Sequence, residues 1–414
     1  MSDNKLTCEE LLKIKSKVDE INKQNSAQNT SSAHKFWETQ PVPKLTDSVK
    51  DYGRLVSEES MKNRKIGEYS LPPGFEWHTM DPNNENDLNN VSDFINTYYL
   101  EDDDGHFRFY YSPEFLKWAL SPPGQEMTDL SVVVQVSKSK KIVGFISGVI
   151  VNMTVGITTQ KMADIDFLCV HPSVRNKSLA SVLIKEVTRR VINSHGISQG
   201  IYSAVRHIPK PISSVKFYHK HINAQKLIDV GFADKSCNYS STLNGSDIQN
   251  TLSLINFRKM ELKDINIAHE LLSSYMKKYT CFPVFSLSEF KHWFIDNDFV
   301  SSYVVVDKNN NPVDMISYFK LKHSVLKNPN YNSIEIACVY YYTCHKYSLG
   351  KLGENMLTMA KNEKMDVVNI TDIMDNDEMI NELKFALGTG TLYYYMFNWK
   401  CPEIASNQLG KCVF

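Results

Sequence analysis

The feature that most constrains the fold is an order of segments that occurs twice, about 170 residues apart. In the first copy, apolar runs at 132–136 and 142–147 are joined by a short polar turn, which is typical of a β-hairpin. The second copy has the same pattern at 303–306 and 313–317. The alternative is a chance likeness of two segments of mixed structure. We predict a duplicated domain with a pseudo-two-fold relation.

The match continues beyond the hairpins. The run 165–170 matches 334–339, which places Cys169 opposite Cys338 in the two copies. Helical periodicity follows at 179–191 and 349–361, and short strands follow at 201–205 and 367–370. A chain of 414 residues is also long enough for two domains. We therefore expect an α+β protein with a tail at 1–33, loosely helical and then disordered, a first domain at 34–245 and a second at 246–414.

Composition excludes several classes of function. The formal net charge is −1, so no general field would attract nucleic acid. No run approaches the roughly 18 apolar residues of a membrane span, and the first residues contain no secretory signal. None of the eight cysteines forms a CxxC pair, and no histidines and cysteines have metal-ligand spacing. These features predict a cytoplasmic protein with reduced thiols, no metal and no stable membrane insertion.

The last five residues, 410–414, are apolar to the end apart from one lysine, whereas most C-termini are solvated. They follow an aromatic run at 393–399. This pattern predicts a terminus drawn into the protein with its free carboxylate inside. The alternative is a final strand that packs there by chance.

A basic turn follows the long strand of the first copy. It offers Arg175 and Lys177 before a helix that Ser178 or Asn176 could cap. Free N–H groups and the positive end of a helix dipole favour anions there. The alternative is a solvated turn. The second copy has fewer cations at 345–350, so we expect only the first to bind a nucleotide tail.

Several separate segments resemble the glycylpeptide N-tetradecanoyltransferase (N-myristoyltransferase) family over about 34–414. They read KFWETQPVP at 35–43, EDDD at 101–104, FRF at 107–109, YSPEFL at 111–116, FLCVH at 167–171 and NWKCP at 398–402. The element order is similar to the acyl-CoA-binding core of the GCN5-related acyltransferases, whose helix N-terminus holds the pyrophosphate. The resemblance implies two tandem domains of this type, with pseudo-two-fold symmetry and a saddle-shaped mixed sheet flanked by helices.

The resemblance also implies the activity and the catalytic groups. A C14 acyl group would pass from coenzyme A to an N-terminal glycine amine, with tetradecanoyl-CoA as co-substrate and no cofactor. The backbone N–H groups of Phe167 and Leu168 would hold the thioester oxyanion. An α-ammonium has a pKa of roughly 7.7–8.0 and only the neutral amine attacks, so a base is needed. The carboxylate of Phe414 would supply it, and Ser203 would contact the amine, unless Ser203 is an ordinary strand hydroxyl.

Two binding sets follow from the resemblance. The residues implied to bind acyl-CoA are Lys35, Phe36, Trp37, Phe167, Leu168, Cys169, Val170, Arg175, Asn176, Lys177, Ser178, Leu179 and Ala180. Those implied to bind the peptide are Tyr99, Leu100, Asp102, Asp104, Phe107, Phe109, Tyr111, Tyr218, His219, Ser317, Thr389 and Leu392. The alternatives are a simple hydrophobic anchor at Phe36 and Trp37, a solvated acidic loop at 101–104 and a buried, satisfied His219.

Some positions depart from the family pattern. The usual Glu-Ile-Asn before Phe-Leu-Cys is Asp-Ile-Asp here, so Asp166 could act as an extra base or perturb the proton path. The usual Gly-Asp-Gly is Gly-Thr-Gly, and Thr389 would weaken a preference for lysine in the substrate. Ser178 replaces an arginine, Val205 a glycine, and Phe414 a leucine or glutamine. These changes suggest a divergent member of altered specificity.

We therefore predict a monomeric, cytoplasmic enzyme that binds tetradecanoyl-CoA and then a protein with an N-terminal glycine. The resemblance also allows association of the tail with ribosomes, and nothing suggests a nucleic-acid partner. The alternatives are an acyltransferase of the same superfamily with another chain length or acceptor, a catalytically silent acyl-CoA or peptide-binding protein, and a structural scaffold.

Overall fold

The computed structural model describes residues 35–62, 67–100, 105–125, 129–234, 245–295 and 297–413. The predicted tail, 1–33, lies outside them. The first half contains α3 (Lys35–Glu38), β1 (Gly53–Arg54), α4 (Glu58–Lys62), β2 (Phe75–Thr79), α5 (Glu85–Tyr98), β3 (Phe107–Tyr110), α6 (Pro113–Leu120), β4 (Val132–Val136), β5 (Ile142–Val155), β6 (Thr158–Val170), α7 (Leu179–His195), β7 (Gly200–Ala204), β8 (Ser213–His221) and α8 (Ala224–Asp229). The second half contains β9 (Phe257–Lys259), α9 (Ile265–Met276), β10 (Cys281–Pro283), α10 (Leu287–Phe294), β11 (Val300–Val306), β12 (Pro312–Val325), β13 (Ser333–Tyr342), α11 (Leu349–Asn362), β14 (Val367–Thr371), α12 (Asn376–Glu382), β15 (Ala386–Phe397) and β16 (Trp399–Lys400).

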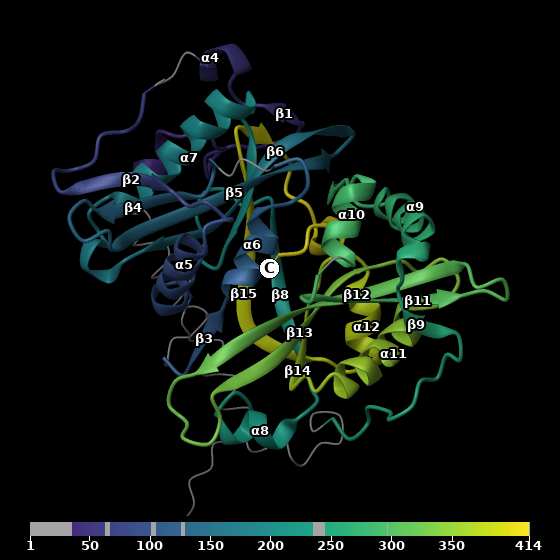
Figure 1. Ribbon diagram of the computed structural model, residues 1–414. Helices are drawn as coiled ribbons and strands as arrows, with labels where there is room; N and C mark the ends of the chain where they lie inside the picture. Colours follow the sequence, from purple (N-terminus) through teal and green to yellow (C-terminus); the bar gives the residue numbers. More distant parts are fainter. Residues whose placement is uncertain are drawn as a thin grey trace, which may run out of the picture.

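One mixed sheet of fourteen strands runs through both halves (Figure 1). Its strands follow the order β2-β4-β5-β6-β7-β15-β8-β14-β13-β12-β11-β9, with β10 paired to β5 and β3 to β12. The order is the same from either end, because β4 to β7 of the first half correspond to β11 to β14 of the second. This confirms the α+β class and the duplicated order of elements. The domain boundary at 245/246 stays a prediction.

Each half contributes one strand to the other half's part of the sheet. β8 of the first half pairs antiparallel with β14, and β15 of the second half pairs antiparallel with β7. β8 and β15 also pair with each other, side by side at the centre of Figure 1. The main buried core likewise draws residues from both halves. Unfolding of either half therefore breaks hydrogen bonds that belong to the other.

A β-bulge interrupts the long central pair of strands in each half. It separates the pairs Phe145–Cys169 and Ser147–Asp166 in the first half, and Ile316–Tyr342 and Tyr318–Val339 in the second. Cys169 therefore corresponds to Tyr342, four residues beyond Cys338, and the predicted match of Cys169 with Cys338 is wrong. The reason is that β6 ends in the apolar run 167–170 and β13 in the apolar run 336–342, so the two patterns fit at more than one register.

The helices that follow these strands begin and end differently. α7 packs Leu183, Val187 and Val191 against β4 and β5, and it ends at Gly196, whose φ of 66° is the left-handed conformation that glycine tolerates. α11 begins after Ser348, whose hydroxyl accepts the N–H of Lys351. The predicted helices at 179–191 and 349–361 are both present.

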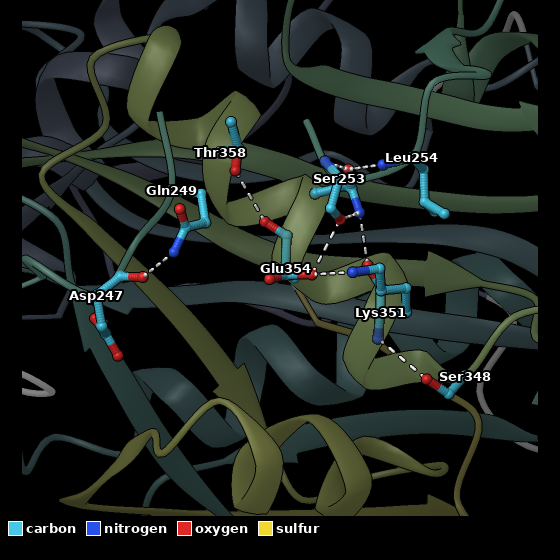
Figure 2. A network of polar contacts seen from close by, with 9 residues as sticks. Asp247, Gln249, Ser253, Leu254, Ser348, Lys351, Glu354 and Thr358 are labelled. Carbon is cyan, nitrogen blue, oxygen red and sulfur yellow. Dashed lines mark hydrogen bonds and ion pairs between the residues drawn. The ribbon is translucent and has the colours of Figure 1, made fainter. Parts of the chain in front are cut away.

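The segment that connects the two halves is held along α11, as Figure 2 shows. The fully buried Asn355 accepts the backbone N–H groups of Ser253, at 2.9 Å, and Leu254, at 3.1 Å. The hydroxyl of Ser253 donates to Glu354, which also pairs with Lys351 at 2.7 Å. One buried amide thus satisfies two backbone donors of this connection, whose described residues 245–256 contain no helix or strand.

The C-terminal segment returns into the molecule after β16, which pairs with β1. Leu409 and Gly410 are buried, and the N–H of Gly410 donates to the carbonyl of Cys281 at 2.7 Å. A Cβ at Gly410 would lie 2.7 Å from Met276, so only glycine fits this approach without a shift. Cys412 is also buried. The predicted inward course of the tail is confirmed as far as Cys412.

Candidate active site

The bulge in β6 supplies the first candidate groups. Phe167 and Leu168 lie where the register between β5 and β6 shifts, and Phe167 has a left-handed φ of 56°. The pKa of the Tyr99 hydroxyl is raised by burial and by the charge of Asp166, and a hydrogen bond with the backbone of Phe167 opposes the shift. The backbone of the bulge therefore forms hydrogen bonds outside the β5–β6 pair, here with the Tyr99 side chain. Backbone N–H groups in such a position can stabilise an oxyanion.

Three charged side chains gather beside the bulge. The Lys411 ammonium lies 2.8 Å from Asp164 and donates to the carbonyl of Cys412 at 2.9 Å. Asp166 is two residues beyond Asp164 on the same strand. Burial raises the pKa of Asp166 to about 7, with a further rise from Asp164 and an opposing effect from Lys411. Burial also opposes the charge of Lys411, but the two aspartates outweigh it and raise its pKa.

These groups line one cavity between the halves, with a volume of about 50 Å³. Its walls include Asp164, Asp166 and Phe167 of β6, Tyr340 and Tyr341 of β13, Trp293 of α10, and Lys411 and Cys412 of the tail. The tail is fixed there because Tyr394 donates to the carbonyl of Lys411 at 2.7 Å and Cys412 donates to Tyr341 at 3.2 Å. The cavity thus combines a backbone bulge, acidic groups and the end of the chain.

The basic turn lies between β6 and α7. The Arg175 guanidinium donates to the carbonyls of Val170, at 3.0 Å, and Tyr98, at 2.9 Å. Ser178, rather than Asn176, occupies the N-cap position, and its side chain makes no capping hydrogen bond. The predicted cap is therefore wrong. The reason is the left-handed φ of 60° at Ser178, since a capping side chain needs an extended backbone.

The corresponding turn of the second half is filled by the protein itself. The fully buried Asp314 accepts the N–H groups of His345, Lys346 and Tyr347 at 2.5, 2.9 and 2.8 Å. Asp314 follows a bulge of β12 against β11, and Gly144 follows a bulge of β5 against β4. Since Gly144 has no side chain, the first turn carries no such internal carboxylate. This difference supports the expectation that only the first turn binds an anion.

The predicted N-terminal anchor packs on the first half. Trp37 stacks on Tyr202 with ring centroids 5.5 Å apart, and Tyr202 stacks on Tyr395 at 5.1 Å. The ammonium of Lys185 on α7 lies 5.9 Å from the ring of Phe36. Phe36 and Trp37 are thus beside the helix that follows the basic turn, in the same region as the other predicted acyl-CoA residues.

Aromatic residues of the predicted peptide set are close to the bulge. The ring of Phe167 lies 5.8 Å from Tyr99 and 5.0 Å from Tyr111, and Phe109 stacks on Tyr111 at 6.0 Å. Phe107 is buried against Phe232. The structure therefore brings this part of the set together at β6. Asp102 and Asp104, like Phe414, lie outside the described residues.

The rest of the predicted peptide set is on β8, β12 and β15. His219 lies 2.7 Å from Asn369, and burial lowers its pKa although this hydrogen bond opposes the shift. Thr389 is exposed in a bulge of β15. Its neighbour Gly388 packs closely on His219, because a Cβ added at Gly388 would lie 2.4 Å from that ring. Ser317 is fully buried and its hydroxyl donates to the carbonyl of Tyr341 at 2.7 Å, so it already has a partner.

The remaining members have ordinary strand positions. Ser203 is on β7, partly buried, and is paired in register with Tyr394. Tyr218 is on β8 opposite Leu387, and Leu392 is buried in the main core. Contact of these residues with a substrate stays a prediction.

Sequence reasoning missed Lys411, Asp164 and Asp314. The signal was present, because each is a charged residue within an apolar run, and such a residue is buried only with a partner. Across the described part of the chain, no three histidine, cysteine or acidic residues are grouped to hold a metal ion. No described helix is long and apolar enough to cross a membrane.

The fold and the cavity define a class: a duplicated α+β protein with a candidate acyl-transfer site between its halves. The chain belongs to the myristoyl-CoA:protein N-myristoyltransferase family. The model of that family's N-terminal domain matches residues 55–215, and the model of its C-terminal domain matches 229–411.

Named relatives and solved structures agree with this assignment. The glycylpeptide N-tetradecanoyltransferase of Drosophila melanogaster is 38% identical over 377 residues, which are 90% of this chain and 79% of the relative. That of Plasmodium falciparum is 38% identical over 381 residues, 91% of this chain and 92% of the relative. A crystal structure of Saccharomyces cerevisiae N-myristoyltransferase with bound myristoyl-CoA has a TM-score of 0.86 at 29% identity, and the match covers 92% of this chain and 100% of that one.

Proposed function

We propose that this chain transfers a tetradecanoyl group from coenzyme A to the α-amine of an N-terminal glycine. The names of its relatives describe this activity. The observation that carries the proposal is the bulge at Phe167 and Leu168, which lies beside one cavity with buried acidic groups and the inward tail. Acyl transfer to an amine needs an oxyanion site and a proton acceptor next to each other.

The acyl-CoA would bind on the first half. Its pyrophosphate would meet the free N–H groups at the start of α7, near Arg175 and Lys177. The matching turn of the second half is already occupied by Asp314, which supports this choice of site. Phe36 and Trp37 would close over the bound acyl-CoA. The peptide would approach along the aromatic side chains of Tyr99, Phe109 and Tyr111.

The carboxylate of Phe414 would take a proton from the substrate amine. Cys412 lines the cavity, and two residues span at most about 7 Å, so a C-terminal carboxylate could reach the bulge. Adding one residue after Phe414 should then lower turnover strongly and leave acyl-CoA binding intact. Unchanged turnover would show that the carboxylate is not the base.

The first test follows coenzyme A release from tetradecanoyl-CoA with a Gly-Asn-x-x-Ser octapeptide. Release that stops when the glycine amine is acetylated supports the proposal. Tight acyl-CoA binding without release, across several glycine peptides, would indicate a catalytically silent binding protein instead.

If Thr389 weakens the preference for lysine in the substrate, replacing a lysine of the peptide should lower turnover only slightly. A large loss of turnover would contradict this. The cytoplasmic, monomeric state and ribosome association stay predictions.

A further inference from the structure

The ion pair between Lys411 of the tail and Asp164 of β6 is buried in the wall of the cavity. The two side chains are 10% and 11% exposed, and the ammonium lies 2.8 Å from the carboxylate. Taking both charges out of water offsets most of their attraction, so replacing such a pair by uncharged residues is often neutral for stability. Stability is therefore a weak explanation for a pair at this place.

The Lys411 ammonium also fixes the backbone of the residue that follows it. It donates to the carbonyl of Cys412 at 2.9 Å, so it holds the orientation of the peptide unit between Cys412 and Val413. After this peptide unit the chain contains only the rest of Val413 and Phe414. Because peptide units are planar and the backbone has only two soft dihedrals per residue, this orientation sets the direction in which the last residues leave Cys412.

The way in which the tail is held changes at Lys411. The residue before it, Gly410, donates its backbone N–H to the carbonyl of Cys281 at 2.7 Å. The carbonyl of Lys411 instead accepts the hydroxyl of Tyr394 at 2.7 Å, and its side chain adds the ion pair with Asp164. The hold on the last residues thus depends on side chains from β6 and β15, which substitutions can remove one at a time.

Asp164 belongs to the strand that carries the bulge. It lies three residues before Phe167 on β6, and it is paired in register with Val149 of β5 on one side and Ile201 of β7 on the other. A residue on a strand with neighbours on both sides is a more precise anchor than one on a loop. The Lys411 ammonium therefore connects a fixed point beside the proposed oxyanion groups to the peptide unit that precedes the end of the chain.

We propose that Lys411 is a positioning residue for the C-terminal carboxylate and that Asp164 anchors it. The proposal rests on the function proposed above, in which the Phe414 carboxylate takes the proton of the substrate amine, and it adds no step to that mechanism. A base must stay within hydrogen-bond reach of the proton that it takes. The ion pair would hold the carboxylate at a constant distance from the bulge, where the amine attacks.

The kinetic test separates positioning from stability. The double variant Asp164→Asn with Lys411→Met removes both charges together, so it leaves no unpaired charge inside the protein and should keep a Tm close to that of wild type. Its kcat should nevertheless fall by about 10²-fold, as a misplacement of about 1 Å can cause. The Kd for tetradecanoyl-CoA should stay within about threefold of wild type, because the lost contact acts on the transition state and not on the bound co-substrate.

Two further variants complete the kinetic test. Asp164→Glu keeps both charges, and with them the fold, but its side chain is one methylene longer and moves the ammonium, so kcat should fall by about tenfold. The matched control is Asp51→Asn with Lys400→Met, which removes an ion pair at the surface near the start of the tail and should keep the wild-type kcat. A wild-type kcat in Asp164→Glu or in the double variant at Asp164 and Lys411 would overturn the proposal.

A digestion experiment tests the same contact without turnover. Carboxypeptidase A removes an aromatic C-terminal residue from a chain end that it can reach, so the rate of phenylalanine release reports how often the end of the tail opens. The double variant at Asp164 and Lys411 should release phenylalanine at least about tenfold faster than wild type, because it lacks a charge-assisted hydrogen bond. The control at Asp51 and Lys400 should release it at the wild-type rate. Equal release by wild type and the double variant would contradict the proposal.

The two measurements also separate this inference from the function on which it rests. Absence of acyl transfer in the wild-type protein would overturn the proposed function, whereas phenylalanine release would still measure how the ion pair holds the tail. Fast phenylalanine release together with a wild-type kcat in the double variant would overturn the positioning role of Lys411 and leave the proposed function intact.

Discussion

Asp314 offers the sharpest test of how the two halves differ. Asp314→Ala removes the acceptor of three backbone N–H groups, at 2.5, 2.9 and 2.8 Å. A hydrogen bond to a charged group contributes about 1.5–3 kcal/mol to stability. His345 and Lys346 are exposed, so water can replace part of the loss and the lower end applies. Three bonds at that value give a loss of about 4 to 5 kcal/mol in the free energy of unfolding.

The same substitution should create an anion site. Three N–H groups of the turn before α11 would then face an empty position, and clustered backbone N–H groups of a turn favour an anion. Inorganic phosphate at 100 times its Kd would restore about 2.7 kcal/mol. Urea and thermal unfolding with and without phosphate measure both effects. Asp314→Asn is the matched variant: its amide nitrogen would face donors, so it should lose stability without phosphate rescue.

Asp307 provides a second control, because its carboxylate also accepts two backbone N–H groups, from Asn309 and Asn311, but in a turn at the tip of a hairpin. Asp307→Ala should cost about 3 kcal/mol at the same value per bond and should not respond to phosphate. If Asp314→Ala is as stable as wild type to within 1 kcal/mol, or if phosphate stabilises all variants equally, the explanation of the second turn is incorrect.

Three further changes have expected outcomes. Asp166→Asn removes a carboxyl whose pKa burial raises above its unfolded value, so wild-type stability falls as the pH rises from the unfolded pKa through the folded one. The variant's Tm should therefore exceed that of wild type more at pH 8 than at pH 4, and an equal difference would contradict this. Asn355→Ala leaves two linker N–H groups without their acceptor and should cost about 2–4 kcal/mol in urea unfolding; a loss below 1 would refute it. Gly410→Ala places a Cβ 2.7 Å from the flexible end of Met276 and 3.0 Å from the Cβ of Phe282, so it should cost about 1 kcal/mol, with a lower Tm as the readout; an unchanged Tm would count against this contact.

Much of the fold follows from local patterns. Alternation and helical periodicity locate both hairpins and both helices, because these patterns depend only on which face is buried. The exchange of β8 and β15 between the halves does not follow, because the sequence of a strand does not specify which strand it pairs with. The register of the repeat fails for a similar reason. β6 and β13 both end in unbroken apolar runs, 167–170 and 336–342, so these runs can be matched at registers four residues apart.

Part of the candidate site is also predictable from the sequence, and part of it is not. The family motifs locate the bulge at Phe167, and the apolar ending indicates a buried tail. The ion pair between Asp164 and Lys411 is missed because its partners are separated by most of the chain, and only the completed fold brings them to 2.8 Å. A lysine alone among apolar residues near a chain end is nevertheless a usable signal. Such a lysine must be either exposed to solvent or paired with a carboxylate.

The two halves use the same framework for opposite purposes. In the second half, Asp314 satisfies the turn before α11 permanently, which stabilises the fold and leaves no place for a ligand anion. In the first half, Gly144 leaves the matching turn without an internal carboxylate. Asp166 likewise holds a charge that burial disfavours, which raises its pKa. The first half therefore keeps two unfavourable features that ligands would relieve, which is the expected arrangement when stability is given up for binding and catalysis.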